Sequence, residues 1–173
     1  MTSRALMPLS VLLLAAACGG APTPATKGPA GAPAGDAKTV FTGAPAYASG
    51  PVASTAAAAH AAKKLPALTK DTACLSCHKT GGSAPSFVFG GTVFTADDGK
   101  TGLADAELRF VDDKGNASSA HSDADGNFWL KGPSVTVETG KAGARKAAVA
   151  KAMDVPASGN CNECHANIPL YVK

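Results

Sequence analysis

The segment Ala106-Glu107-Leu108-Arg109-Phe110 decides the fold class of this chain, because apolar and charged side chains alternate along it. In an extended strand, successive side chains point to opposite faces of the sheet. The three apolar side chains therefore share one face, and Glu107 and Arg109 share the other. A strand with one apolar and one polar face is typical of an antiparallel sheet that covers a core on one side.

The sequence around this segment predicts more short strands, separated by turn residues. Asp-Gly and Gly-Asn pairs favour tight turns, because these residues tolerate a positive φ. Such turn residues lie in the connectors 98–99, 112–116 and 123–127, which we expect to be hairpin turns. The spacing favours a small antiparallel β-sandwich or barrel. Its further strands are expected at 91–95, 118–122, 128–130 and 135–138.

The central part of the chain also carries a family resemblance. The run from Gly91 through Asp105-Ala106 to 123–128 resembles the carboxypeptidase regulatory-like, transthyretin-like β modules. The resemblance implies a β-sandwich module at about this place in the chain.

Two pentapeptides flank the predicted strands: Cys74-Leu75-Ser76-Cys77-His78 and Cys161-Asn162-Glu163-Cys164-His165. Each is a C-x-x-C-H motif, in which two thiols add to the vinyl groups of one porphyrin and the histidine binds its iron. Together they use every cysteine beyond the N-terminal segment. The sequence therefore predicts two covalently bound haem c groups. The expected binding residues are Cys74, Cys77 and His78 for one haem, and Cys161, Cys164 and His165 for the other.

Cysteine pairs with this spacing also occur in zinc sites and in disulfides. Two C-x-x-C pairs can form a tetrathiolate zinc site, but zinc does not need the histidine that follows both pairs. Two local disulfides are a second alternative in an exported protein, although no thioredoxin-like pattern surrounds either pair. The loop 123–126 contains two aspartates, but it lacks the rest of a calcium-binding EF-hand loop.

A six-coordinate haem iron needs a distal ligand, usually His or Met. Beyond the two motif histidines the chain has His60 and His121, and beyond the N-terminal segment it has one methionine, Met153. Four histidines match four axial positions, so we expect two bis-histidine haems with His60 and His121 as distal ligands. The alternatives are a solvated helix residue for His60, an exposed strand residue for His121 and a packing role for Met153. A vacant distal position on one of the two irons is a further alternative.

The N-terminus has the features of an export signal. Arg4 precedes a short, mostly apolar run that ends in small residues before Cys18, and the run is too short to span a bilayer. The segment resembles a bacterial lipoprotein signal, which implies lipidation of Cys18. An ordinary secretory signal is the alternative. Because Gly19 follows the cysteine where inner-membrane retention uses aspartate, the resemblance implies the outer membrane, facing the periplasm or the cell surface.

The chain is expected to be mainly β, with short helical haem-binding segments around a small antiparallel sandwich. A helix at 56–65 with a Ser54-Thr55 cap is expected to carry His60, and another short helix is expected at 143–153. The parts are a signal peptide at 1–17, a disordered Ala/Pro/Gly linker at 18–54, a first haem c segment at 55–86, the β module at 87–140 and a second haem c segment at 141–173.

These features predict an exported electron carrier, a dihaem c-type cytochrome, whose partners are other redox proteins of the cell envelope and, through the anchor, the membrane. The net charge of +3 is too small for a nucleic-acid-binding surface, and no phosphate-binding loop or nucleophile with a local base is present. One alternative is an adhesion or ligand-binding lipoprotein whose cysteines form disulfides or a zinc site. Another is a haem peroxidase, which would need an open iron position.

Overall fold

The computed structural model describes residues 38–50, 55–65, 67–69, 72–134, 136–137, 141–153 and 157–173. The predicted signal peptide, Cys18 and most of the predicted linker lie outside these residues. Within them, no helix is long and apolar enough to cross a membrane.

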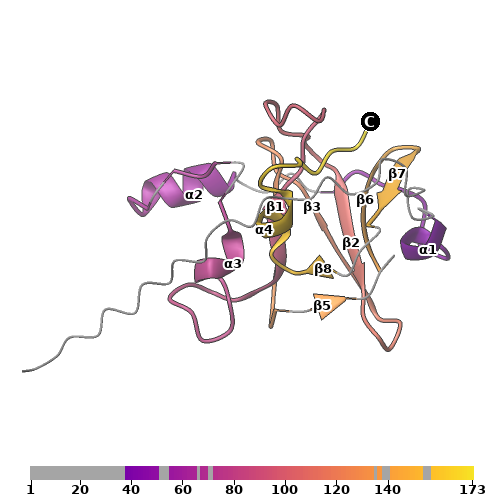
Figure 1. Cartoon of the computed structure of the whole chain (residues 1–173), viewed down its shortest axis with the longest axis horizontal. Helices are drawn as coiled ribbons and strands as arrows, with labels where there is room; N and C mark the ends of the chain where they lie inside the picture. Colours follow the sequence, from indigo (N-terminus) through magenta and orange to yellow (C-terminus); the bar gives the residue numbers. More distant parts are fainter. Residues whose placement is uncertain are drawn as a thin grey trace, which may run out of the picture. The chain divides into compact units, whose positions relative to one another are not determined.

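Four strands form the larger sheet, in the order β3-β2-β6-β7 (Figure 1). All neighbours in it are antiparallel. At the centre, β2 pairs with β3 on one side and with β6 on the other, placing Leu108 opposite both Ala120 and Ala144. The strands are β2 (Glu107–Val111), β3 (Ala117–His121), β6 (Ala142–Lys146) and β7 (Val149–Ala152).

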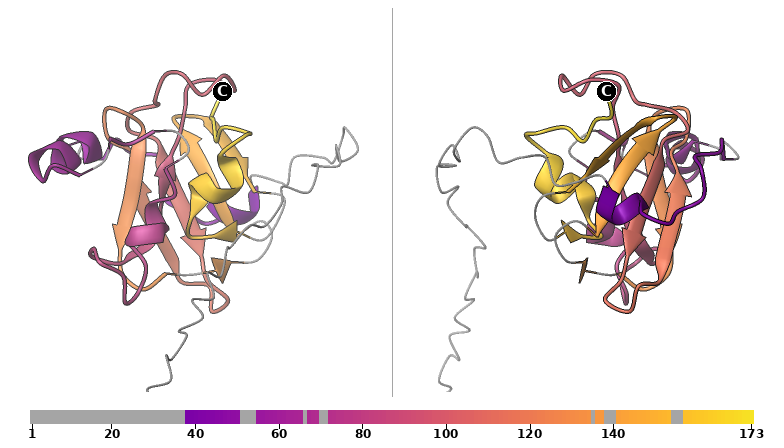
Figure 2. Two further views of the ribbon diagram at one scale, coloured as in Figure 1. Left: turned by 60° about the vertical axis from the view of Figure 1, so that its left-hand side comes forward. Right: turned by 90° about the vertical axis from the view of Figure 1, so that its right-hand side faces the viewer.

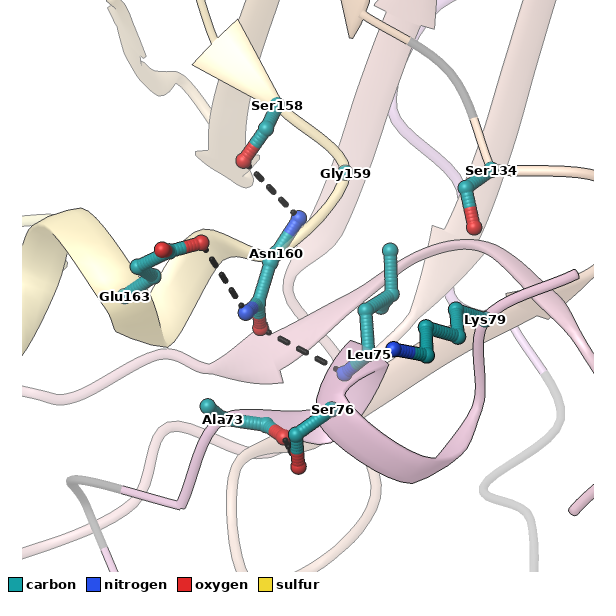
Figure 3. A pocket seen from close by; sticks show the side chains of 9 residues that line it. All are labelled: Ala73, Leu75, Ser76, Lys79, Ser134, Ser158, Gly159, Asn160 and Glu163. Atoms are coloured by element: carbon teal, nitrogen blue, oxygen red, sulfur yellow. Dashed lines mark hydrogen bonds between the residues drawn. The ribbon is translucent and has the colours of Figure 1, made fainter. Parts of the chain in front are cut away.

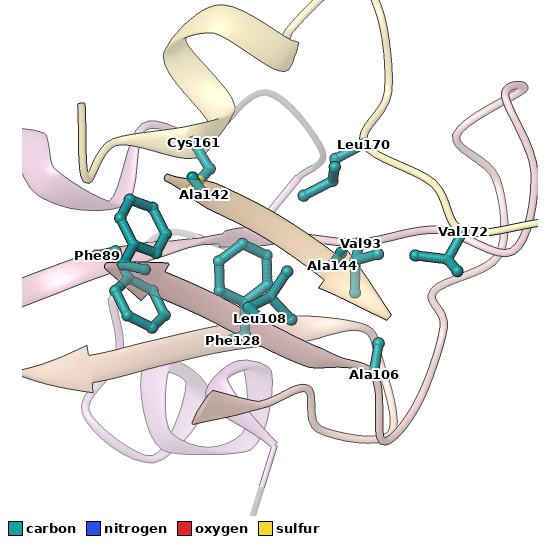
Figure 4. Close-up of a cluster of buried hydrophobic side chains, with 11 residues drawn as sticks. Phe89, Val93, Ala106, Leu108, Phe128, Ala142, Ala144, Cys161, Leu170 and Val172 are labelled. Carbon is teal, nitrogen blue, oxygen red and sulfur yellow. The ribbon is translucent and has the colours of Figure 1, made fainter. Parts of the chain in front are cut away.

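A second sheet consists of β1 (Phe87–Thr92) and β4 (Asn127–Lys131), which are antiparallel, and two short strands, β5 (Thr136–Val137) and β8 (Ala157–Ser158), pair with each other. The ring of Phe89 in β1 stacks on that of Phe110 in β2, with centroids 4.4 Å apart. The two larger sheets therefore share one apolar core. Figure 4 shows side chains of this core, including Leu170 and Val172 from the C-terminal segment.

Four short helices accompany the strands: α1 (Lys38–Phe41), α2 (Ala56–Ala62), α3 (Cys74–Cys77) and α4 (Cys161–His165). Helix α1 contacts the larger sheet (Figure 2). Helix α2 buries no residue and projects from the sheets. Helices α3 and α4, which contain the two motifs, both contact β1.

The mainly β, antiparallel class is confirmed, and strands lie at the places where alternation predicted them. The strand expected at 91–95 begins earlier, at Phe87, and ends at Thr92. The capped helix is also confirmed, although it ends at Ala62 and not at Leu65: the Thr55 hydroxyl accepts a hydrogen bond from Ala58 N at the start of α2.

The helix expected at 143–153 is wrong, because this segment forms the β6–β7 hairpin. Alanine and lysine favour helices, but such propensities are weak compared with tertiary packing. Ala142 and Ala144 are buried beside β2, where small alternating side chains suit a covered strand. Ala147 makes the turn with a φ of 51°, a conformation that helices do not use.

The connector 123–127 is a turn, but it is not a hairpin, because β3 and β4 belong to different sheets. Its first residue, Asp123, is fully buried and accepts hydrogen bonds from the backbone N–H groups of Asp125 and Asn127. Its other carboxylate oxygen accepts from Ala56 N, at the start of α2. The aspartate thus forms a corner that also holds the helix carrying His60.

The last part of the expected linker is packed in the structure. Val40 is only 1% exposed, and its carbonyl accepts a hydrogen bond from Arg109 Nε. The Tyr47 hydroxyl donates to Asp105 Oδ2 at 2.8 Å, and Arg145 lies 4.7 Å over the ring of Phe41. Residues 38–50 are therefore a covering segment of the β module, where the sequence suggested a disordered linker through residue 54.

Candidate haem-binding site

The two motif helices meet at a pair of glycines in β1. A Cβ atom added at Gly90 would lie 3.3 Å from Cys74 Cβ, and one added at Gly91 would lie 2.7 Å from Cys161 Cβ. Glycine in a strand often marks a place where another group approaches the backbone closely. Gly90 and Gly91 thus leave room for the first cysteine of each motif.

Two asparagines join the motifs to each other. Leu75 N, inside the first motif, donates to Asn160 Oδ1 at 3.4 Å, and Asn160 precedes the second motif. Asn162, inside the second motif, donates from Nδ2 to the Thr72 carbonyl at 2.9 Å and accepts from Thr92 N at 2.8 Å. Asn162 is only 2% exposed. The two motifs, distant in sequence, therefore have a fixed mutual position.

A hollow of about 440 Å³ lies between α3 and α4, with Asn160 beside it (Figure 3). Leu75, Lys79 and Glu163 are among the residues that line it. No cysteine or histidine of either motif lines this hollow, so it does not face the groups that would hold a porphyrin.

Both motif histidines have the same hydrogen bond. His78 Nδ1 lies 2.7 Å from the Pro85 carbonyl oxygen, and His165 Nδ1 lies 2.7 Å from the Ile168 carbonyl oxygen. A carbonyl oxygen only accepts, so Nδ1 carries the proton in each ring. The lone pair of a neutral imidazole is then on Nε2, and this is the atom that can bind a metal. Histidines that bind a metal usually donate the N–H of their other ring nitrogen to a carbonyl or carboxylate oxygen.

His60 lies beside the first motif. The ring centroids of His60 and His78 are 6.4 Å apart, and the ring planes differ by 30°. Two imidazoles on opposite sides of one metal ion, each with a metal–nitrogen bond of about 2 Å, have ring centroids about 6 Å apart. The centroid spacing of His60 and His78 is close to this value. The ring of Phe87 stacks on His78 with centroids 3.9 Å apart, which restricts rotation of the imidazole.

The second motif borders a separate, mostly apolar hollow of about 370 Å³. Cys161, Cys164, His165 and Met153 all line it. Ile168 also lines it and is 71% exposed. An apolar hollow with these donors fits an apolar macrocycle held by two cysteines and one histidine.

His121 is held in another environment. Its Nδ1 lies 3.0 Å from Asp105 Oδ1, and Lys146 Nζ lies 3.0 Å from Asp105 Oδ2. Burial alone would raise the pKa of Asp105, but hydrogen bonds from Lys146, Tyr47 and Gly50 hold that pKa well below its usual range. His121 does not line the hollow of the second motif. The structure thus brings His60 and Met153 to the motifs, and it places His121 in a charged cluster.

The motif cysteines are free thiols in the structure. The first cysteine of each pair is the more buried one. Burial raises the pKa of Cys74 to about 11. The pKa of Cys161 is raised to about 12, mainly by burial and to a smaller extent by the nearby Cys74. Burial therefore favours the neutral thiol over the thiolate at both of these cysteines. Among the described residues, no group of three or more His, Cys, Asp or Glu could hold a metal ion.

Comparison with models of protein families, with curated proteins and with solved structures found no match to this chain.

Several residues that shape the site were not singled out from the sequence: Gly90, Gly91, Asn160, Asn162 and Phe87. Only the glycine pair offered a readable signal, because adjacent glycines in a strand indicate close approach of another group; the strand predicted at 91–95 contained Gly91 but not Gly90. The asparagines gave none, because their partners at Leu75, Thr72 and Thr92 are close only in the folded chain.

Proposed function

We propose that this protein is an exported dihaem c-type cytochrome, which carries electrons between redox proteins of the cell envelope. The observation that carries the proposal is the repeated geometry of the two C-x-x-C-H motifs. In each, a backbone carbonyl holds the histidine by Nδ1 and leaves Nε2 for a metal. Neither a structural zinc site nor a disulfide needs this arrangement of the histidine.

Each motif has a defined role for its residues. Cys74 and Cys77, and likewise Cys161 and Cys164, would hold a porphyrin through thioethers, and His78 and His165 would bind its iron. A haem at each site would supply a one-electron iron couple. Phe87 and the carbonyls of Pro85 and Ile168 orient the imidazoles.

His60 is the proposed distal ligand of the first haem. Its ring lies 6.4 Å from that of His78, and Thr55 and Asp123 together fix the start of its helix. Helix α2 buries no residue, so core packing does not account for its position. A role of His60 as a ligand would account for it.

The two sites are close enough to form one functional unit. Cys74 and Cys161 lie against the adjacent residues Gly90 and Gly91, and Asn162 links one motif to the backbone before the other. We therefore infer that an electron passes between the two sites within one molecule, and that the redox partner at one end need not be the partner at the other.

The β module is the scaffold of this pair. We infer a small β-sandwich, because β1 and β2 pack their phenylalanines against each other and the core contains residues from both larger sheets. The resemblance to transthyretin-like modules supports the same arrangement. Lipidation of Cys18 would hold the module at a membrane, with the outer membrane as the proposed location.

The first test is the mass of the full chain, expressed with haem attachment machinery and analysed together with a haem stain of a denaturing gel. We expect two covalent haems in the wild type. Cys77→Ala and Cys164→Ala change exposed residues, and each should disturb attachment at its own site only. Ser76→Ala is the control, because Ser76 is exposed and lies between the first two cysteines.

A wild-type chain without covalent haem would exclude the cytochrome and favour the adhesion or ligand-binding alternative. Carbon monoxide binding by the reduced, fully loaded protein would reveal an open iron position and favour a peroxidase.

A further inference from the structure

We infer that Met153 is the distal ligand of the second haem, so that the two haems of this protein have different axial ligands. The inference rests on the proposed function and deepens it. It differs from the expectation drawn from the histidine count, which gave both irons two histidines.

The backbone places Met153 at the mouth of the second site. It follows β7 directly, and its N–H donates to the Ala142 carbonyl at 2.9 Å, so the residue is tied to the larger sheet. Its side chain is half-buried, packs against the core and lines the same hollow as Cys161, Cys164 and His165. Met153 is therefore a methionine at the border of the space that a porphyrin bound to Cys161 and Cys164 would fill.

Competing ligands in this hollow are few. Lys151 lines it, but its ammonium lies 3.5 Å from the centroid of the Tyr171 ring, which engages both side chains. An ammonium must also lose its proton before it can bind a metal, whereas a thioether is always neutral. His121 does not line the hollow and is held by Asp105.

Different ligands give the two haems different reduction potentials. A His/Met pair raises the potential of a c-type haem above that of a bis-histidine pair. With His60 and His78 at the first site, and His165 and Met153 at the second, one electron would move downhill from the first site to the second. The donor to this protein would then dock near α2 and α3, and the acceptor near α4 and the C-terminal segment.

The test uses the full, haem-loaded chain and four proteins: wild type, Met153→Leu, Met153→His and His121→Ala. The oxidised wild type should show a weak far-red sulfur-to-iron charge-transfer band, and its redox titration should have two separate steps. Met153→Leu, which has an apolar side chain of similar size, should lose the band and make one haem high-spin. Met153→His should restore a low-spin iron without the band and move the upper step to lower potential. His121→Ala should leave the band and both steps unchanged.

The inference is overturned if Met153→Leu keeps the wild-type spectrum and both potentials, or if His121→Ala alone converts a haem to high spin. The number of covalent haems, measured by mass in every variant, separates this outcome from failure of the proposed function. A chain with two haems and no methionine ligand refutes only the inference, whereas a chain without covalent haem refutes both.

Discussion

Replacing Asn162 with alanine should weaken the link between the two motif helices. The Asn162 side chain is almost completely buried, and it accepts from Thr92 N at 2.8 Å and donates to the Thr72 carbonyl at 2.9 Å. Alanine leaves one backbone donor and one backbone acceptor without these partners. Each buried polar group that loses its partner costs about 1–3 kcal/mol, so we expect a loss of about 2–4 kcal/mol in the free energy of unfolding.

The assay is denaturant unfolding of the haem-loaded protein, followed by the haem absorbance and by circular dichroism. Asn116→Ala is the matched control, since Asn116 is exposed and its amide donates to Asp112 within the 112–116 turn. That control should cost less than about 1 kcal/mol. Equal losses for the two variants would refute the reasoning that Asn162 joins the motifs. Mass measurement must first show that Asn162→Ala carries both haems, because the residue lies between the two cysteines of its motif.

Three further predictions concern the glycine pair, the first haem and the charged cluster. Gly91→Ala places a Cβ 2.7 Å from Cys161 Cβ and should cost about 1–3 kcal/mol of stability, whereas Gly90→Ala, with its nearest contact at 3.3 Å, should cost less in the same unfolding assay. His60→Ala should make one haem high-spin and open it to carbon monoxide, and unchanged spectra would refute its role as a ligand. Asp105→Asn should lower the free energy of unfolding at neutral pH. Folding depresses the pKa of Asp105, so the difference in stability between wild type and variant should shrink as the pH falls below about 4. A difference that does not change with pH would contradict the hydrogen bonding of the Asp105 carboxylate.

Local patterns were sufficient to predict most of the secondary structure. The alternation at 106–110 gave β2 within one residue, and the Thr55 cap gave the start of α2, because both signals depend on the residues of the element itself. The segment 143–153 failed for the opposite reason. Strand β6 of this segment depends on pairing with β2, and the residues of the segment itself give no signal for that pairing.

The motif residues could be singled out from the sequence because each C-x-x-C-H motif lies within five consecutive residues. Distal ligands have no such spacing. His60 came from counting histidines, and the structure places it next to His78. The same count favoured His121, yet its contact with Asp105 exists only in the folded chain, as does the position of Met153 beside the second motif.

The position of the β module in the sequence explains how two distant motifs come together. Strand β1 begins nine residues after His78, whereas the second motif follows the module, and the two ends of the module meet at Gly90. Gly90 N donates to the Gly159 carbonyl at 2.9 Å, and Gly90 also forms a parallel bridge with Asn160. The residues just before the second motif therefore extend the free edge of β1, opposite β4. The backbone hydrogen bond between Gly90 and Gly159, supplemented by the side chains of Asn160 and Asn162, thus fixes the start of the second motif beside β1. If haems bind at both motifs as proposed, their spacing should stay constant through each cycle of reduction and oxidation, because moving one site would require breaking these hydrogen bonds.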